Sequence, residues 1–187
     1  LGIARRSAKG IELRVHPTLI PDEELIANVN GVKNAVLVQA NAVGPTLYYG
    51  AGAGAGPTAS AVVADVVDIV RDIIYTEDGA GTIPQLAFEA LSDLPILSSD
   101  EMTTGYYLRI NAEDQTGVLA DVTTILSRLG IGIDAIMQQP RLKDLIPIVI
   151  LTDPIQESKM NEAIAKIQAL SFVHGEAVRI RLELLDN

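Results

Sequence analysis

The sequence predicts an α+β protein made of two parts and a connector, because its strand and helix patterns fall into two separate groups. Residues 1–75 contain short strand patterns followed by one long apolar helix. Residues 104–187 alternate strand and helix patterns in the order βαββαβ, and residues 76–103 lie between the two groups. The chain has 187 residues, of which 48% are hydrophobic, so it is long enough to bury a real core.

The first part is expected to begin with two short strands, 3–8 and 11–15, joined by a turn at Lys9 and Gly10. The second strand alternates apolar and charged residues, which is typical of a half-exposed sheet. Pro17 ends this strand because proline cannot donate a hydrogen bond. Asp22 is expected to cap a short helix that follows. The helix is predicted to bury Leu25, Ile26 and Val29.

A second hairpin is predicted from strands 33–40 and 46–49, and a glycine-rich turn follows it. This turn alternates glycine and alanine from Gly50 to Gly56, and Pro57 and Thr58 come next. Without side chains, its backbone can approach a ligand closely. A helix start also offers unpaired N–H groups and a positive dipole end. The pattern fits either a ligand-binding turn or a plain strand-to-helix connection, and it lacks the lysine of a phosphate loop.

A long helix is predicted from Thr58 to Tyr75, with Pro57 in its first turn and Thr58 or Ser60 capping its N–H groups. Its valines and isoleucines form two neighbouring stripes, so the apolar arc is wider than a surface helix needs. We expect this helix to be buried on more than one side. We interpret its acidic residues as a solvent-exposed face that does not bind a metal. These residues are Asp65, Asp68 and Asp72.

Composition excludes several classes of function. The formal net charge is −10, which argues against binding nucleic acid. The chain has no cysteine, and its two histidines, His16 and His174, stand far apart, so we expect no metal site. We see neither a signal peptide nor an apolar run long enough to cross a bilayer. These features predict a soluble, cytoplasmic protein that does not act at a membrane.

The last part is predicted to be a split βαβ unit with antiparallel strands and two helices on one face. Gly130 is expected to stop the first helix. Asp153 is expected to cap the second helix, with Pro154 at its first position. The predicted strands are 106–112, 131–137, 145–152 and 172–184, and the first helix is 118–129. The connector 76–103 is acidic and broken by glycine and proline, with a short helical turn expected at 84–91.

The glycine-rich segment closely resembles a part of homoserine dehydrogenases, which carry a G-x-G-A-G-x-x-P-T-A-S-A-V pattern. The resemblance runs from Leu1 to about Ile74, and the matching string here is GAGAGAGPTASAVVADVVDIVRDI. It implies that residues 1–75 are the C-terminal part of the catalytic and dimerisation domain of such an enzyme. It also implies a nicotinamide cofactor, NAD or NADP, beside the turn. The cofactor-binding residues that it implies are Gly52, Ala53, Gly54 and Thr58.

The same resemblance implies an oxidoreductase that interconverts L-homoserine and L-aspartate 4-semialdehyde in threonine, methionine and isoleucine biosynthesis. In that family a dinucleotide-binding Rossmann domain and the catalytic lysine and acidic residues come before the segment that Leu1 begins. We therefore expect no catalytic residue within these 187 residues, and no dehydrogenase activity from them alone.

The last part strongly resembles an ACT domain, the amino-acid-sensing module of metabolic enzymes, through the string INAEDQTGVLADVTTILSRLGIGIDAI. Such domains share an acidic-x-x-Gly turn before the first helix, here Asp114 to Gly117. The resemblance implies a ferredoxin-like regulatory domain at 104–187 that binds an effector, for which L-threonine is expected. The effector-binding residues that we expect are Asp114, Gly117, Val118, Leu119 and Asp134. Alternatively, Asp114 only caps the helix and Gly117 only turns the chain.

We expect at least a homodimer, because strand edges at Tyr106–Ala112 and Ile131–Met137 can pair across a two-fold axis. The hairpin at 33–49 is expected to add a second contact. The alternative to a dehydrogenase part is a non-catalytic amino-acid-binding regulatory or dimerisation protein. The PTASAV string favours the dehydrogenase, since a sensor alone has no need of residues 1–74.

Overall fold

The structure is a computed structural model that describes residues 1–75, 93–140 and 145–185. The chain divides into two compact units. The first unit contains residues 1–20 and 94–185, and the second contains residues 21–93. The first unit is therefore built from two separate stretches of chain. Most of the connector expected at 76–103, including its short helical turn at 84–91, lies outside the described residues.

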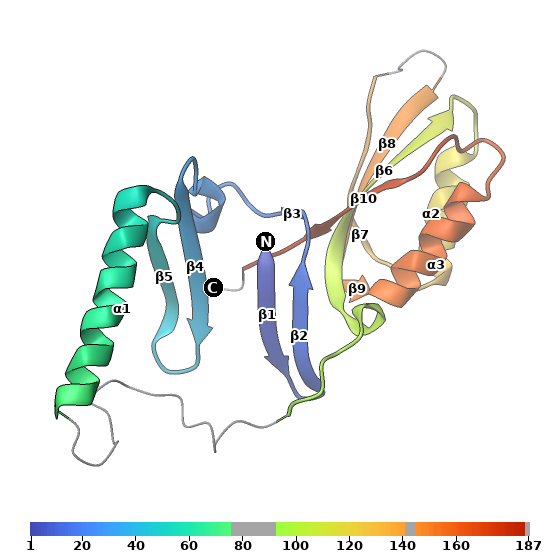
Figure 1. The fold of residues 1–187 in the computed structure, drawn as a ribbon. Helices are drawn as coiled ribbons and strands as arrows, with labels where there is room; N and C mark the ends of the chain where they lie inside the picture. Colours follow the sequence, from blue (N-terminus) through green and yellow to red (C-terminus); the bar gives the residue numbers. More distant parts are fainter. Residues whose placement is uncertain (76–92, 141–144, 186–187) are drawn as a thin grey trace. The chain divides into compact units, whose positions relative to one another are not determined.

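The main sheet of the first unit has the predicted βαββαβ order (Figure 1). Its strand order is β3-β10-β6-β8-β7, and the pairs within β10-β6-β8-β7 are antiparallel. Two short strands extend it, since β3 (Thr18–Leu19) pairs with β10 in parallel and β9 (Ile155–Gln156) pairs with the start of β6. The main elements are β6 (Thr103–Glu113), α2 (Val118–Arg128), β7 (Ile133–Gln138), β8 (Leu145–Thr152), α3 (Glu157–Gln168) and β10 (Val178–Leu182).

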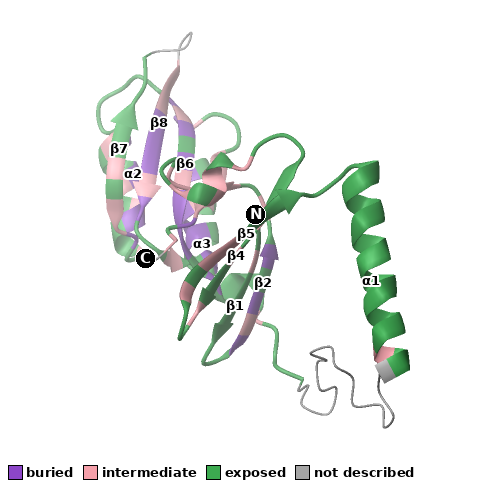
Figure 2. Ribbon diagram, turned by 90° about the vertical axis from the view of Figure 1, so that its left-hand side faces the viewer, coloured by how far each residue is buried: buried purple, intermediate pink, exposed green. Residues whose placement is uncertain are grey.

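The hydrophobic core lies between this sheet and the helices α2 and α3, as the purple segments in Figure 2 show. Strand β6 buries Leu108 and Ile110, whereas the alternating residues Tyr107 and Arg109 are more accessible. The apolar stripes of α2 and α3 face the same core. The largest fully buried side chains are Tyr106, Leu108, Ile110, Val122, Leu126, Ile148, Ile150, Met160 and Ile167.

Among the element starts in this unit that differ from the prediction, two have a clear structural cause. Helix α3 begins at Glu157, not after Asp153, because Ile155 and Gln156 pair with β6 first. The N–H of Glu157 then donates to the carbonyl of Met102 at 2.8 Å. The last strand begins at Val178, six residues later than the predicted 172, since the chain turns through Gly175 at φ +74°. Helix α2 does end as predicted at Gly130, which has φ +70°.

The predicted first hairpin is present as β1 (Gly2–Ser7) and β2 (Gly10–Val15). It belongs to the same unit as the main sheet, where the N–H of Ile11 donates to the carbonyl of Pro95 at 2.8 Å. Its burial reverses the usual alternation. Glu12 and Arg14 are buried, whereas Val15 is 89% exposed. The charged face of β2 therefore takes part in the interior of the unit.

The second unit contains η1 (Leu25–Asn28), the hairpin of β4 (Lys33–Ala40) and β5 (Gly44–Ala51), and helix α1 (Ala55–Tyr75). The hairpin is confirmed, and α1 starts three residues before the predicted Thr58. The short helix predicted after Asp22 is a 3-10 turn that starts after Glu24 without a side-chain cap, so the predicted Asp22 cap is wrong. The Asn28 amide instead donates to the carbonyls of Asp22 and Glu24.

Helix α1 is exposed along its length within this chain, as its green ribbon shows (Figure 2). Its valines and isoleucines from Val62 to Ile74 are 41% to 75% exposed. The prediction that it is buried on more than one side is therefore not met among the described residues. In the described part of the chain no helix is long and apolar enough to cross a membrane.

Candidate cofactor and effector sites

The glycine-rich turn connects β5 directly to α1 in the second unit. The N–H of Gly52 donates to the carbonyl of Val32 at 3.0 Å, which fixes the exit of the hairpin. Gly54 has φ +127°, a conformation that residues with a side chain rarely adopt. The N–H of Thr58 then donates to the carbonyl of Gly54 at 3.0 Å and closes the first helical turn. Hydrogen bonds therefore fix the backbone of this turn, and its conformation at Gly54 requires glycine.

The structure brings three of the four predicted cofactor residues together in this turn, namely Gly52, Ala53 and Gly54, and all three are exposed. Thr58 lies inside α1, where its N–H is already used, so the prediction that Thr58 or Ser60 caps the helix is wrong. Pro57 is in the first turn, as predicted. The N–H groups of Ala55 and Gly56 begin the helix and have no acceptor one turn earlier within it.

Sequence reasoning missed Asn34, whose side chain lies against this turn. A Cβ atom built on Gly52 would stand 1.7 Å from Asn34 Nδ2. Asn34 pairs with Gly50 in the register of the hairpin. Residues 34 and 52 lie together only because the hairpin register places them beside one another. The sequence around Asn34 carries no motif that indicates this contact.

The acidic-x-x-Gly turn leads into α2, with Gly117 as its N-cap residue at φ +96°. Nothing lies within 4 Å of a Cβ built there, so the conformation alone requires glycine. The side chain of Val118 is buried in the core, and the side chain of Leu119 packs against the core. A ligand at this turn would therefore contact the backbone of these two residues. Asp114 is not the N-cap residue, and the N-cap makes no side-chain hydrogen bond. Whether the Asp114 side chain caps α2 therefore stays a prediction.

Asp134 lies in β7 at an irregularity, where the pairing with β8 shifts between Ile133 and Ala135. Its side chain is exposed. Strand β7 is the last strand in the sheet order, so it presents one edge of the main sheet. Strand β6, in contrast, lies between β10 and β8, and the prediction that Tyr106–Ala112 is an open edge is wrong.

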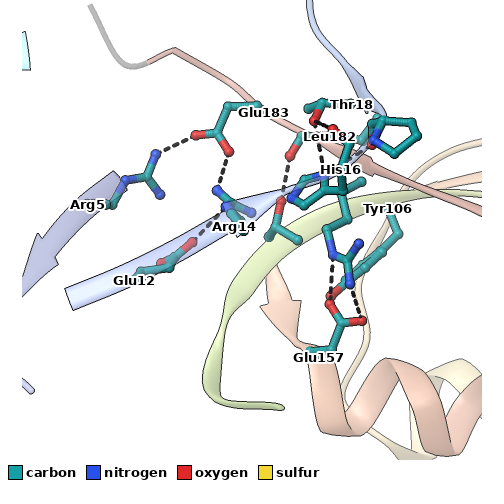
Figure 3. A network of polar contacts seen from close by, with 12 residues as sticks. Arg5, Glu12, Arg14, His16, Thr18, Tyr106, Glu157, Leu182 and Glu183 are labelled. Atoms are coloured by element: carbon teal, nitrogen blue, oxygen red, sulfur yellow. Dashed lines mark hydrogen bonds and ion pairs between the residues drawn. The ribbon is translucent and has the colours of Figure 1, made fainter. Parts of the chain in front are cut away.

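A buried cluster of charges connects β2 to the residue that follows β10 (Figure 3). The Arg14 side chain is 2% exposed and contacts Glu12 Oε1 at 2.8 Å and Glu183 Oε2 at 2.5 Å. Arg5, which is 47% exposed, makes a further ion pair with Glu183. The N–H of Glu183 also donates to the carbonyl of Leu19 in β3 at 3.0 Å. Residues near both ends of the chain therefore meet in one polar cluster.

A second cluster surrounds Glu157 at the start of α3. The Tyr106 hydroxyl donates to Glu157 Oε2 at 2.7 Å, Arg181 donates to both carboxylate oxygens, and Arg179 lies 3.1 Å from Oε1. Burial raises the pKa of Glu157, but hydrogen bonds from Arg181 and Tyr106 outweigh it, so the pKa ends below its usual value. Burial, together with the Glu157 carboxylate, raises the pKa of Tyr106. Glu157 is therefore held ionised inside the fold.

Comparison with known proteins matches two separate stretches of the chain to two family models. Residues 1–67 match the family model for homoserine dehydrogenase, and residues 106–169 match the model for the ACT domain. In the part of the chain that the structure describes, no group of histidine, aspartate and glutamate side chains is arranged to hold a metal.

Two curated homoserine dehydrogenases are similar over nearly the whole chain. The Pseudomonas aeruginosa protein is 55% identical over 100% of this chain, and the Neisseria gonorrhoeae protein is 48% identical over 99%. The chain spans 43% of the length of each relative. A crystal structure of a homoserine dehydrogenase from Thiobacillus denitrificans is 56% identical with a TM-score of 0.89, covering 99% of this chain and 42% of that one.

Proposed function

We propose, since the chain is the C-terminal part of a homoserine dehydrogenase catalytic domain followed by an ACT domain, that it serves an NAD(P)-dependent enzyme acting on L-homoserine and L-aspartate 4-semialdehyde. The observation that carries this proposal is the glycine-rich turn, which lies within the matched residues 1–67 and has a backbone shape that requires glycine. The chain's share of its relatives' length makes it a contributor to that activity, with other parts of the protein needed as well.

The turn suits the nicotinamide end of a dinucleotide. Gly52, Ala53 and Gly54 present backbone with almost no side chain, so a flat ring can lie against it. Gly54 holds the conformation that starts α1 directly after the turn, and the free N–H groups of the first helical turn favour a polar or anionic group nearby. Thr58 would contribute through its hydroxyl, because its N–H is used. The cofactor, when bound, would supply the hydride acceptor or donor of the reaction.

Proton transfer is assigned to residues outside this chain. Lys9 lies exposed in the turn between β1 and β2, and Lys33 lies over the Tyr49 ring at 5.7 Å from its centroid. Neither lysine has the buried, charged surroundings that tune a catalytic amine. The 187 residues alone are therefore expected to be inactive.

The experiment uses the complete protein, in which this chain is joined to the further length that its relatives have. Homoserine-dependent reduction of NAD and of NADP is measured for the complete protein, for the 187-residue chain, and for Gly54→Val. Gly56→Ala is the matched control, because nothing lies within 4 Å of a Cβ there and its φ is not positive. We expect activity only in the complete protein, a raised cofactor KM for Gly54→Val, and an unchanged one for Gly56→Ala. Turnover by the 187-residue chain, or an unchanged KM in Gly54→Val, would contradict the proposal.

We further propose that the ACT domain binds an amino acid, with L-threonine as the expected effector. The backbone N–H groups at Gly117 and Val118 would take the carboxylate at the start of α2, where the helix dipole favours negative charge. The Asp114 carboxylate would take the ammonium group, and the backbone at Leu119 would line the site. Asp134 at the edge strand β7 of a second subunit would close it, in a homodimer or a larger assembly.

Regulation requires that the effector bind two states of the protein unequally, and about 1–3 kcal/mol of coupling is enough for strong inhibition. The buried cluster around Arg14 and Glu183 supports such a coupling. It fastens the end of β10 in the ACT fold to the hairpin β1-β2, which lies within the segment matched to homoserine dehydrogenase. A change in β10 would reach that hairpin directly.

L-threonine is titrated into the protein by calorimetry, with Gly117→Leu as the test variant and Gly130→Leu as the control. Both glycines have positive φ and open space around them, but they lie at opposite ends of α2. We expect millimolar threonine to release heat with the wild type and with Gly130→Leu, and none with Gly117→Leu. Equal threonine binding by the two variants would show that the effector does not bind at this turn. If neither the wild type nor either variant released heat, the ACT domain would have a role in assembly alone.

A further inference from the structure

The amide of Asn34 occupies the space above Gly52 in the glycine-rich turn. A Cβ atom built on Gly52 would lie 1.7 Å from Nδ2, 2.2 Å from Cγ and 2.8 Å from Oδ1 of Asn34. Real atoms cannot approach so closely, so the whole amide stands where a side chain at position 52 would have to be. Position 52 therefore requires glycine because of a neighbouring side chain, and not because of an unusual backbone angle.

The hairpin register creates this contact. Lys33 pairs with Ala51 and Asn34 with Gly50, so Gly52 follows the last pair of the ladder. The hydrogen bond from the N–H of Gly52 to the carbonyl of Val32 keeps the two chains together beyond that pair. Asn34 and Gly52 are then diagonal neighbours on one face of the hairpin, within reach of a side chain. The position of the amide is therefore set by backbone pairing on both sides.

The hydrogen-bonding groups of this amide are unused. A primary amide offers two N–H donors and a carbonyl acceptor. Among the described residues, no protein group forms a hydrogen bond with the Asn34 side chain, and Asn34 is exposed. A polar group held against the backbone of a proposed cofactor turn, with its donors and acceptor open, is suited to contact what binds there.

We propose that Asn34 is a cofactor-positioning residue, whose amide pairs with the carboxamide of a nicotinamide ring lying against the turn. The proposal rests on the function proposed above and adds a residue to its site. Two primary amides are complementary, because each offers a donor and an acceptor. Asn34 Nδ2 donates to the carboxamide oxygen, and Oδ1 accepts from the carboxamide nitrogen. This pairing fixes the rotation of the ring and thus the position of the carbon that exchanges hydride.

The test compares NAD(P) with its 3-acetylpyridine analogue, in which an acetyl group replaces the carboxamide and the two N–H donors are lost. Dissociation constants of both are measured by calorimetry with the complete protein, its Asn34→Ala and Asn34→Asp variants, and Asn41→Ala. Asn41 is the matched control, an exposed asparagine in the turn at the opposite end of the same hairpin. Asn34→Asp keeps the shape that packs on Gly52 but removes the donors.

The wild type and Asn41→Ala should bind the native cofactor more tightly than the analogue by about threefold to tenfold, the range for one lost hydrogen bond. Asn34→Ala should bind the native cofactor more weakly by a similar factor and no longer distinguish it from the analogue. Asn34→Asp should also lose affinity for the native cofactor.

Equal weakening of both ligands in Asn34→Ala would assign Asn34 a structural role and overturn the inference, as would unchanged affinities. A complete protein that binds neither ligand would instead refute the proposed function itself. A protein that binds both and reduces NAD(P) with homoserine, yet shows no dependence on Asn34, would refute only this inference.

Discussion

Removing Arg14 should destabilise the first unit far more than removing Arg5, although both arginines contact the same glutamate. The Arg14 side chain is 2% exposed and lies between Glu12 and Glu183, whose side chains are 9% and 5% exposed. Replacing Arg14 with methionine keeps much of its volume but leaves two buried carboxylates without their shared cation. Breaking a buried pair in this way costs about 3–5 kcal/mol, because an uncompensated charge remains in the interior.

Arg5 provides the internal comparison. Its side chain is 47% exposed, so water screens its ion pair with Glu183. Exposed pairs contribute about 0–1 kcal/mol, and Glu183 keeps Arg14 when Arg5 is replaced. Arg5→Met should therefore cost about 1 kcal/mol or less. The difference between the two variants isolates the effect of burial from that of charge, since the same substitution is made in both.

The measurement is equilibrium unfolding in urea, followed by circular dichroism of the 187-residue chain. With a slope of about 1–3 kcal/mol per molar urea, Arg14→Met should lower the midpoint by about 1–5 M, and Arg5→Met by about 1 M or less. The slopes should agree with the wild type, since the surface exposed on unfolding hardly changes. Equal midpoints for the two variants would refute the reasoning, because they would show that the buried cluster contributes no more than a surface pair.

Three further measurements follow from the structure. Leu126→Ala should cost about 2–5 kcal/mol in thermal unfolding, because Leu126 is 0% exposed, and a loss below 1 kcal/mol would mean that the core is loosely packed. Glu157 has a lowered pKa, so its stabilising contribution is complete above about pH 4.5 and disappears as the pH falls through the lowered value. The stability difference between wild type and Glu157→Gln should therefore shrink in acid, and a constant difference would show that the carboxylate charge is unimportant. Light scattering at micromolar concentration should show at least a dimer. Met137 is 55% exposed on the edge strand β7, so Met137→Lys should weaken the dimer, and an unchanged dimer would exclude the β7 edge as its contact.

The elements of the ACT fold were predictable because each carries a clear local period. In β6 the alternation of Leu108 and Ile110 with Tyr107 and Arg109 matches the burial of the strand. The spacing of Val118, Val122 and Leu126 matches the buried face of α2. Gly130 marks the end of that helix through its positive φ, as a C-terminal glycine should. These patterns depend only on neighbouring residues.

The errors arose where a distant partner decides the outcome. The alternation in β2 predicts a half-exposed strand without indicating which face is buried, and Arg14 is buried because Glu183 supplies its charge partner from 169 residues away. The start of α3 was placed too early, since Ile155 and Gln156 pair with β6. The prediction that β6 is an edge is wrong because the sequence shows which segments are strands but leaves their order open.

The candidate site was partly predictable for the same reason. Gly52 and Gly54 stand out in the sequence, and Gly54 has the positive φ that a glycine there suggests. The reason for Gly52 lies in Asn34, eighteen residues earlier, and becomes visible only once the hairpin register is known. At the acidic turn, Gly117 has the positive φ that a glycine before the helix suggests.

The second unit is inserted into the chain of the first, which leaves at residue 20 and returns at residue 94. Two covalent connections therefore join the units, where consecutive domains usually share one. Strand β3 anchors the first connection in the sheet, and the Ile11–Pro95 hydrogen bond anchors the second. Both connections therefore leave the first unit at positions that its own backbone hydrogen bonds fix.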